Sequence, residues 1–138
     1  MNSPDKPTAE TPRLRALIVD DEGHIRFFLR TLLGLSAFDI VGEASNGLEA
    51  LKLYRELRPD VVLLDVNMPF KNGNEVLAEI RAIDPHAQVI MLTSVADSET
   101  VKACIEQGAA SYIRKDAVVE EIEAALGRVH DQLRSRTG

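Results

Sequence analysis

The chain has 138 residues, a formal net charge of −6 at pH 7, and 45% hydrophobic and 28% charged residues. This length suits one domain around one core, and the composition is that of a soluble globular protein. The acidic balance argues against a nucleic-acid or membrane-surface role, since both need a concentrated basic face. No apolar run approaches the roughly 20 residues that span a bilayer, and the N-terminus lacks the basic-then-apolar order of a signal peptide. We therefore expect a cytoplasmic protein without nucleic-acid or membrane partners.

The first segment, residues 1–12, contains three prolines together with Ser, Thr, Asp and Glu, and no large apolar residue after Met1. This composition predicts a flexible N-terminal tail. From residue 13 onward, the apolar patterns typical of strands and helices alternate without an interrupting linker. We expect one domain over residues 13–134 and a short C-terminal tail over residues 135–138.

Five short apolar runs are typical of strands, and a helical pattern follows each of them. The expected strands are 14–19, 38–43, 60–64, 88–92 and 111–114. Alternating strands and helices favour a mostly parallel sheet with helices on both faces, joined by right-handed crossovers. The sequence thus predicts an α/β fold of three layers.

The helices are marked by capping patterns. Residues 46–49 and 72–75 both begin with Asn and end with Glu, which is the spacing of a capping box with Asn in place of Ser or Thr. Gly34 and Gly108 lie where the preceding helices should end. The last helix carries its apolar residues on one stripe, at steps of three and four. These residues are Val118, Ile122, Leu126, Val129 and Leu133.

A polar residue follows four of the five strand patterns. The first run leads into Asp20 and Asp21, the third into Asp65, the fourth into Thr93 and the fifth into Lys115. If these runs are neighbouring parallel strands, their carboxyl ends lie along one edge of the sheet, where open α/β sheets bind ligands. Three carboxylates, a hydroxyl and an ammonium in one pocket suit a divalent cation and a phosphoryl group.

The first helix carries one aromatic residue away from its apolar face. Phe27 falls on the opposite side from the apolar arc, near Arg26 and Arg30. It is either a tolerated surface aromatic or part of a partner-binding patch beside the acidic pocket. The arc itself consists of Ile25, Phe28, Leu29, Leu32, Leu33 and Leu35.

The motifs at the strand ends resemble the receiver domain of two-component response regulators. The resemblance covers about residues 13–134 and implies a flavodoxin-like (βα)5 fold, with a central parallel five-stranded sheet of order 2-1-3-4-5. The chain ends just after the fifth helix, so we expect a single-domain receiver, similar to chemotaxis and relay regulators that act by protein contact. The matching motifs are Asp20-Asp21, Leu64-Asp-Val-Asn-Met-Pro69, Leu92-Thr-Ser94 and Tyr112-Ile-Arg-Lys115.

The resemblance implies that Asp65 is the phosphoacceptor, which takes a phosphoryl group from a phosphohistidine on a histidine kinase or histidine phosphotransfer protein. It also implies a Mg²⁺ (or Mn²⁺) site. Asp21 and Asp65 would each give one oxygen, the backbone carbonyl of Asn67 would be a third ligand, and Asp20 would act through a bound water. Without the ion the carboxylates repel one another, so Mg²⁺ should stabilise the fold. The alternative for Asp65 is a helix or turn cap.

Three residues receive further roles from the same resemblance. Lys115 would pair with a phosphoryl oxygen, and Thr93 would donate its hydroxyl to the phosphoryl group. Tyr112 would move inward as Thr93 moves towards the phosphate, which would change the face built from helix 4, strand 5 and helix 5 for a downstream protein target. The alternatives are a solvated surface lysine and a threonine that merely closes a strand.

Two positions concern the lifetime of the phosphoryl group. Asn67 and Val95 lie two residues after Asp65 and Thr93, and in the family these positions border the path of the hydrolytic water. Because the Val95 side chain cannot orient a water, we expect a fairly long-lived phosphoryl form.

The fifth strand departs from the family pattern. Many receivers have Lys-Pro here, often with a cis peptide bond, whereas Lys115 is followed by Asp116. A cis bond before a non-proline residue costs about 2.5–4 kcal/mol. Either the bond is trans and Lys115 is displaced, or the site tolerates that strain.

Two rival functions remain open at this point. A pseudo-receiver would be an unphosphorylated protein-interaction module, although the Asp, Thr and Lys that such proteins normally lack are present. An Asp-nucleophile Mg²⁺ phosphatase is the enzymatic alternative. Haloacid-dehalogenase-like phosphatases space two acids as Asp-x-Asp, whereas Asn67 lies two residues after Asp65. We therefore expect a signalling phosphoacceptor rather than an enzyme, either monomeric or weakly dimeric.

The remaining reactive side chains are expected to be structural. Cys104 is the only cysteine, so no intramolecular disulfide is possible, and we expect it to be a small core residue on the fourth helix. The three histidines are expected at the surface. They are His24, His86 and His130.

Overall fold

The computed structural model describes residues 13–68, 71–94 and 98–137 of the protein. In this part of the chain, strands and helices alternate, and the strands agree with the expected ranges to within one residue at each end. In chain order the elements are β1 (Leu14–Val19), α1 (Gly23–Gly34), β2 (Phe38–Ala44), α2 (Gly47–Leu57), β3 (Val61–Asp65), α3 (Gly73–Ile83), β4 (Gln88–Thr93), α4 (Ser98–Glu106), β5 (Ser111–Arg114) and α5 (Val119–Thr137).

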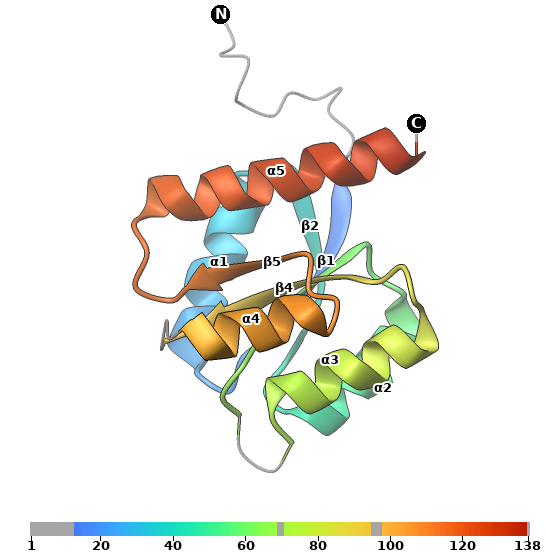
Figure 1. The fold of residues 1–138 in the computed structure, drawn as a ribbon. Coiled ribbons are helices and arrows are strands. Elements are labelled where there is room, and N and C mark those ends of the chain that lie inside the picture. The colour runs from blue at the N-terminus through green and yellow to red at the C-terminus, as the bar shows by residue number, and fades with distance from the viewer. Residues whose placement is uncertain (1–12, 69–70, 95–97, 138) are drawn as a thin grey trace, which may run out of the picture.

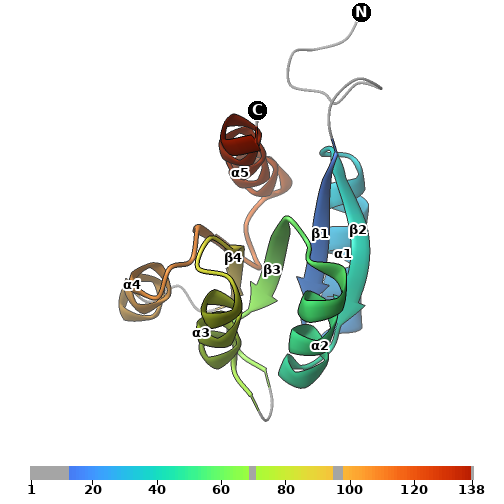
Figure 2. The same ribbon diagram turned by 90° about the vertical axis from the view of Figure 1, so that its right-hand side faces the viewer.

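The strands form one parallel sheet in the order β2-β1-β3-β4-β5. Figure 2 shows β4, β3, β1 and β2 side by side in that order. The central strand β3 is buried along its whole length, which explains its uninterrupted apolar sequence. This topology confirms the predicted flavodoxin-like α/β fold.

Two apolar layers cover the two faces of the sheet. Helices α1 and α5 pack on one face, whereas α2, α3 and α4 pack on the other. Figure 1 shows α5 above strands β4 and β5, and α3 and α4 below them. The first layer includes Leu29, Leu33, Ile122, Leu126 and Val129. The second includes Leu51, Tyr54, Val76, Ile80 and Cys104.

One irregularity interrupts the pairing of the edge strand β2 with β1. Ala16 lies opposite Ile40 and Leu17 lies opposite Gly42, so Val41 is an extra residue in β2. Such a bulge locally breaks the strict alternation of a strand. Ile40 accordingly packs against the α1/α5 layer, whereas Ala44 belongs to the opposite layer.

Both predicted helix starts are confirmed. The Asn46 side chain accepts a hydrogen bond from the Glu49 N–H at 2.9 Å, and Asn72 accepts one from the Glu75 N–H at 3.0 Å. In α3 the Glu75 carboxylate completes the capping box by accepting from the Asn72 N–H at 3.4 Å. In α2 the returning bond comes instead from the residue before the cap. Each cap contributes about 1 kcal/mol.

The helices differ from expectation at several positions. Leu35 caps α1 and is 66% exposed, so the apolar arc of this helix ends earlier than its sequence indicates. Helix α5 continues to Thr137 and so includes 135–137, which the sequence placed in a short C-terminal tail. His130 is buried, contrary to the expected surface position. It follows Leu126 by one helical turn on the core face, and its ring packs edge-on against Phe38 at 5.6 Å.

Cys104 is buried as expected. No helix among the described residues is long and apolar enough to cross a bilayer.

Candidate functional site

The strand ends bring the predicted polar residues to one edge of the sheet. Asp20 follows β1, Asp65 closes β3, Thr93 closes β4 and Lys115 follows β5. Backbone hydrogen bonds hold these ends in register: the Lys115 N–H donates to the Thr93 carbonyl at 2.8 Å, and the Asp20 N–H donates to the Ala44 carbonyl at 3.1 Å. The parallel sheet therefore assembles residues that lie up to 95 positions apart in sequence.

Three carboxylates converge at this edge. Asp20, Asp21 and Asp65 each place one oxygen within 4.8 Å of the other two. Asp20 and Asp65 are buried, whereas Asp21 is exposed. Loop N–H groups orient the two buried groups, because Oδ1 of Asp20 accepts from Glu22 at 2.9 Å and Oδ1 of Asp65 accepts from Asn67 at 3.0 Å.

Lys115 bridges the two buried carboxylates. Its Nζ lies 2.8 Å from Oδ2 of Asp20 and 3.1 Å from Oδ2 of Asp65, and only 10% of the lysine side chain is exposed. A more distant carboxylate oxygen, from Glu22, lies 4.0 Å from the same Nζ. Apart from these ion-pair contacts, the Oδ2 atoms of Asp20 and Asp65 accept no hydrogen bond of good geometry from the described residues.

Burial and neighbouring charges shift the pKa values of Asp65 and Lys115. Desolvation, followed by the negative charge of Asp20, raises the pKa of Asp65 to about 7, although the Lys115 ammonium and the Asn67 N–H act in the opposite direction. Burial by itself would lower the pKa of Lys115, but its contacts with Asp20 and Asp65 outweigh that effect, so its pKa is raised. One ammonium thus offsets the two buried carboxylates only in part, and the pocket retains excess negative charge.

This arrangement fits a hard divalent cation. The converging ligand atoms are carboxylate oxygens, which Mg²⁺ prefers. Among the described residues, the Oδ2 atoms of Asp20 and Asp65 have the Lys115 ammonium as their one charged contact. Asp20, Asp21 and Asp65 are the residues that would hold the ion. The predicted ligation by the Asn67 carbonyl stays a prediction, since the described contact of Asn67 is made by its N–H.

The Lys115–Asp116 peptide bond is trans, as is every peptide bond between described residues. Lys115 nevertheless reaches both buried carboxylates, so the absence of a proline does not displace it from the pocket. The Asp116 side chain turns outward and accepts two hydrogen bonds from Arg114, at 2.9 and 2.8 Å.

The other predicted residues lie at different depths. Thr93 is buried at the end of β4. Tyr112 on β5 lies opposite Met91 in the sheet and is 41% exposed. Phe27 is 61% exposed, and the Arg30 guanidinium lies 5.3 Å from its ring centroid. Val95, on which the predicted lifetime of the phosphoryl group depends, lies outside the described residues.

Two residues beside the pocket were missed by the sequence reasoning. Arg26 was noted only as a neighbour of Phe27, yet its guanidinium donates to the Asp20 carbonyl at 2.6 Å. Its position in the first turn of α1, directly after the acidic pair, was the available signal. Gly73 was read only as part of a cap, but a Cβ there would lie 2.1 Å from the Asp65 carbonyl oxygen.

The comparison with known proteins agrees with this geometry. Residues 16–127 match the family model described as the response regulator receiver domain. The chemotaxis protein CheY of Listeria monocytogenes is 43% identical over 116 residues, which covers 81% of this chain and 98% of that protein. CheY of Thermotoga maritima is 36% identical over 115 residues, covering 83% of this chain and 96% of that protein.

Solved structures give the same result. The structure of the CheX–CheY–BeF3–Mg²⁺ complex from Borrelia burgdorferi contains a chain with a TM-score of 0.82 and 29% identity, covering 86% of this chain and 90% of that chain. The receiver domain of the response regulator NarL from Mycobacterium tuberculosis has a TM-score of 0.80 and 31% identity, covering 87% and 98%. The chain therefore belongs to the response regulator receiver domain family, and its similarity to CheY assigns it to two-component signalling.

Proposed function

We propose that the protein accepts a phosphoryl group on Asp65 from a histidine kinase or histidine phosphotransfer protein and signals, in the cytoplasm, through a change in its surface. The observation that carries the proposal is the shared ion pair in which Lys115 contacts both Asp20 and Asp65. It gathers a nucleophilic carboxylate, a second acid and a cation in one buried pocket at the ligand-binding edge of the sheet.

Phosphoryl transfer requires little more than positioning and charge neutralisation. A carboxylate oxygen of Asp65 forms the new bond to phosphorus while the P–N bond of the phosphohistidine breaks. The electron pair of that bond returns to the imidazole ring, which takes up a proton. The Lys115 ammonium balances charge on the phosphoryl oxygens, and the Thr93 hydroxyl donates a hydrogen bond to one of them.

Mg²⁺ or Mn²⁺, when bound, would neutralise phosphoryl charge. Asp21 and Asp65 would ligate it directly, the Asn67 carbonyl would be a third ligand, and Asp20 would act through water. The support for this set is the clustering of the three carboxylates within 4.8 Å, with an exposed member, Asp21, on the solvent side.

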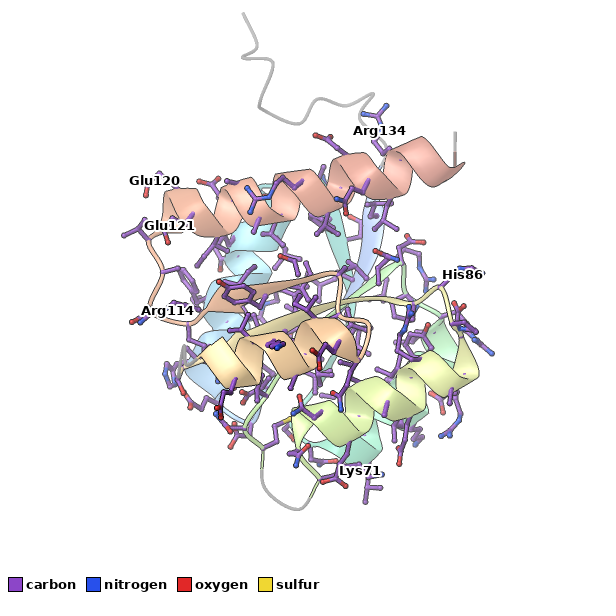
Figure 3. All side chains as sticks on the ribbon, in the orientation of Figure 1. Lys71, His86, Arg114, Glu120, Glu121 and Arg134 are labelled. Carbon is purple, nitrogen blue, oxygen red and sulfur yellow. The ribbon has the colours of Figure 1, made fainter. Side chains whose placement is uncertain are left out.

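The signal would pass through Thr93 and Tyr112. Tyr112 borders a groove of about 380 Å³ between β5 and α5, which is also lined by Arg114, Glu121 and Arg128. Figure 3 shows Arg114 and Glu121 at the end of the molecule where β5 leads into α5. Because Tyr112 is 41% exposed, an inward movement coupled to Thr93 would alter this groove, and with it the affinity for a target protein.

A second surface is proposed for the phosphoryl donor. Phe27 lies on the first turns of α1, which follow the acidic pair directly, and its ring is exposed and held by Arg30. Large aromatic residues with an arginine neighbour are frequent anchors of protein interfaces. Phe27 is therefore proposed as part of a donor-binding patch.

The decisive experiment incubates the purified protein with acetyl phosphate and Mg²⁺ and reads its intact mass. Asp65→Asn is the test variant, and Asp131→Asn, which changes an exposed aspartate of α5, is the matched control. We expect one added phosphoryl group in the wild type and the control, and none in Asp65→Asn or without Mg²⁺.

The rivals give different results. No addition from acetyl phosphate or from a phosphorylated donor protein would indicate a pseudo-receiver. Turnover of a small phosphoester beyond one equivalent would indicate the phosphatase.

A further inference from the structure

A network of charged side chains lies on the outer side of the acidic pocket. Arg26 donates from Nη1 to the Asp20 carbonyl at 2.6 Å, and its Nε lies 3.5 Å from Oε1 of Glu43 on β2. The other oxygen of Glu43 accepts from Arg30 at 2.8 Å. The side chains of Arg26 and Glu43 are only 24% and 25% exposed, so both are held against the protein surface.

The same network contacts the backbone of Asp20, the first residue after β1. The N–H of Asp20 donates to the Ala44 carbonyl of β2, and the carbonyl of Asp20 accepts from Arg26. Arg26 in turn is paired with Glu43, the neighbour of Ala44. Strand β2 therefore holds both ends of the Asp20 residue, one directly and the other through Arg26. The peptide bond between Asp20 and Asp21 is fixed by the second of these contacts.

The charge of Arg26 does not explain its position. An arginine beside three carboxylates lowers the attraction of the pocket for a divalent cation, which a site selected for charge alone would avoid. Its guanidinium points a donor at a main-chain carbonyl and another at Glu43, outside the cluster. The planar fork of arginine suits two acceptors at fixed positions, which a lysine ammonium on a flexible stem does not reproduce.

We propose that Arg26, anchored by Glu43, is a positioning residue that presets the Asp20–Asp21 peptide for cation binding. The inference rests on the proposed function, because it concerns the same Mg²⁺ site. Residues that orient ligands from behind commonly change metal affinity by tenfold or more. Loss of the Arg26 contact should therefore weaken cation binding by about tenfold while leaving the carboxylates themselves in place.

The test measures cation affinity on the full chain with Mn²⁺ as the probe, by water-proton relaxation, and Mg²⁺ by competition. The variants are Arg26→Met, Arg26→Lys and Glu43→Gln, with Arg55→Met, an exposed arginine of α2, as the matched control. We expect about tenfold weaker Mn²⁺ binding in Arg26→Met, a smaller loss in the other two variants, and wild-type affinity in the control. A purely electrostatic role predicts the reverse: tighter binding in Arg26→Met and no change in Arg26→Lys.

A second measurement separates positioning from general destabilisation. Phosphorylation by acetyl phosphate is followed across Mg²⁺ concentrations at a temperature well below the melting transition of each variant. The half-saturating Mg²⁺ concentration should rise by the same factor as the Mn²⁺ dissociation constant, while the rate at saturating Mg²⁺ stays at the wild-type value. If Arg26→Met does not fold, Arg26→Lys and Glu43→Gln carry the same test.

The outcomes distinguish the positioning role of Arg26 from the proposed phosphoacceptor function. Wild-type affinity, or tighter binding, in the folded Arg26 variants overturns the positioning role and leaves the proposed function intact. A wild-type protein that neither binds Mn²⁺ nor becomes phosphorylated overturns both. A lower saturating rate with unchanged cation affinity also overturns the positioning role, because the defect would then lie in the phosphoryl transfer.

Discussion

Asp65→Asn should make the metal-free protein more stable, and the gain should grow with pH. In the wild type, burial and the charge of Asp20 raise the pKa of Asp65 to about 7 from an ordinary value of 3.8. The folded state therefore binds this proton more tightly than the unfolded state does. The resulting stabilisation is fully present below about pH 4 and is lost as the pH rises through 7. Asparagine has no proton to lose, so the variant avoids that loss.

The size of the effect follows from the shift. A difference of roughly 3 pKa units, at about 1.36 kcal/mol per unit, corresponds to about 4 kcal/mol above pH 7.5 and about 2 kcal/mol at pH 5.5. The amide can still accept the hydrogen bond that the Asn67 N–H gives to Oδ1. Its weaker contact with Lys115 subtracts an amount that does not depend on pH in this range. The increase between pH 5.5 and 8 is therefore the quantity to measure.

The assay is urea unfolding in a buffer with a metal chelator at pH 5.5, 6.5 and 8, followed by far-UV circular dichroism because the chain has no Trp. Glu123→Gln, an exposed carboxylate on α5, is the control and should show no comparable pH trend. The stability difference between Asp65→Asn and the wild type should increase by about 2 kcal/mol from pH 5.5 to 8. A stability difference that stays constant, or that shrinks as the pH rises, would refute the raised pKa of the buried Asp65 carboxyl group.

Three further predictions concern the same edge of the sheet. Millimolar Mg²⁺ should raise the melting temperature of the wild type more than that of Asp65→Asn, because a cation bound to the folded state stabilises it by about 2.7 kcal/mol at 100 times its dissociation constant; no shift would count against the acidic site. Gly73→Ala should cost about 1–3 kcal/mol and slow phosphorylation, because its Cβ would lie 2.1 Å from the Asp65 carbonyl oxygen. Its control is Gly127→Ala, whose new Cβ has no atom of the described residues within 4 Å and which should gain about 1 kcal/mol of helix propensity. Equal effects of the two substitutions in urea unfolding would contradict the crowding at Gly73. Val95→Glu should shorten the lifetime of the phosphoryl group, since a carboxylate can orient the hydrolytic water, and an unchanged decay measured by intact mass would remove that interpretation.

Features set by local sequence could be predicted, whereas features set by distant contacts could not. The two Asn caps and the limits of the strands follow from neighbouring residues. The order of the elements, and the sheet edge on which Asp65 lies, could therefore be predicted. His130 was expected at the surface because its side chain is polar, although it follows Leu126 by one turn on the apolar stripe of α5; it packs against Phe38, which lies 92 positions earlier in the chain. The hydrogen bond between Arg26 and the Asp20 carbonyl could not be predicted, because the periodicity of a sequence does not indicate which side chains bind the main chain.

The extra residue in β2 determines which helix receives the Glu43 carboxylate. Before Val41, the even-numbered residues Phe38 and Ile40 face α1 and α5. After Val41, the even-numbered residues face the other side of the sheet, so Gly42 lies against Leu57 of α2. Glu43 consequently points to the α1 side, where Arg26 and Arg30 meet it. If Val41 instead took part in regular alternation with β1, Glu43 would be directed towards the apolar layer under α2. The bulge at Val41 thus keeps the Glu43 carboxylate on the side of α1, where it pairs with Arg26.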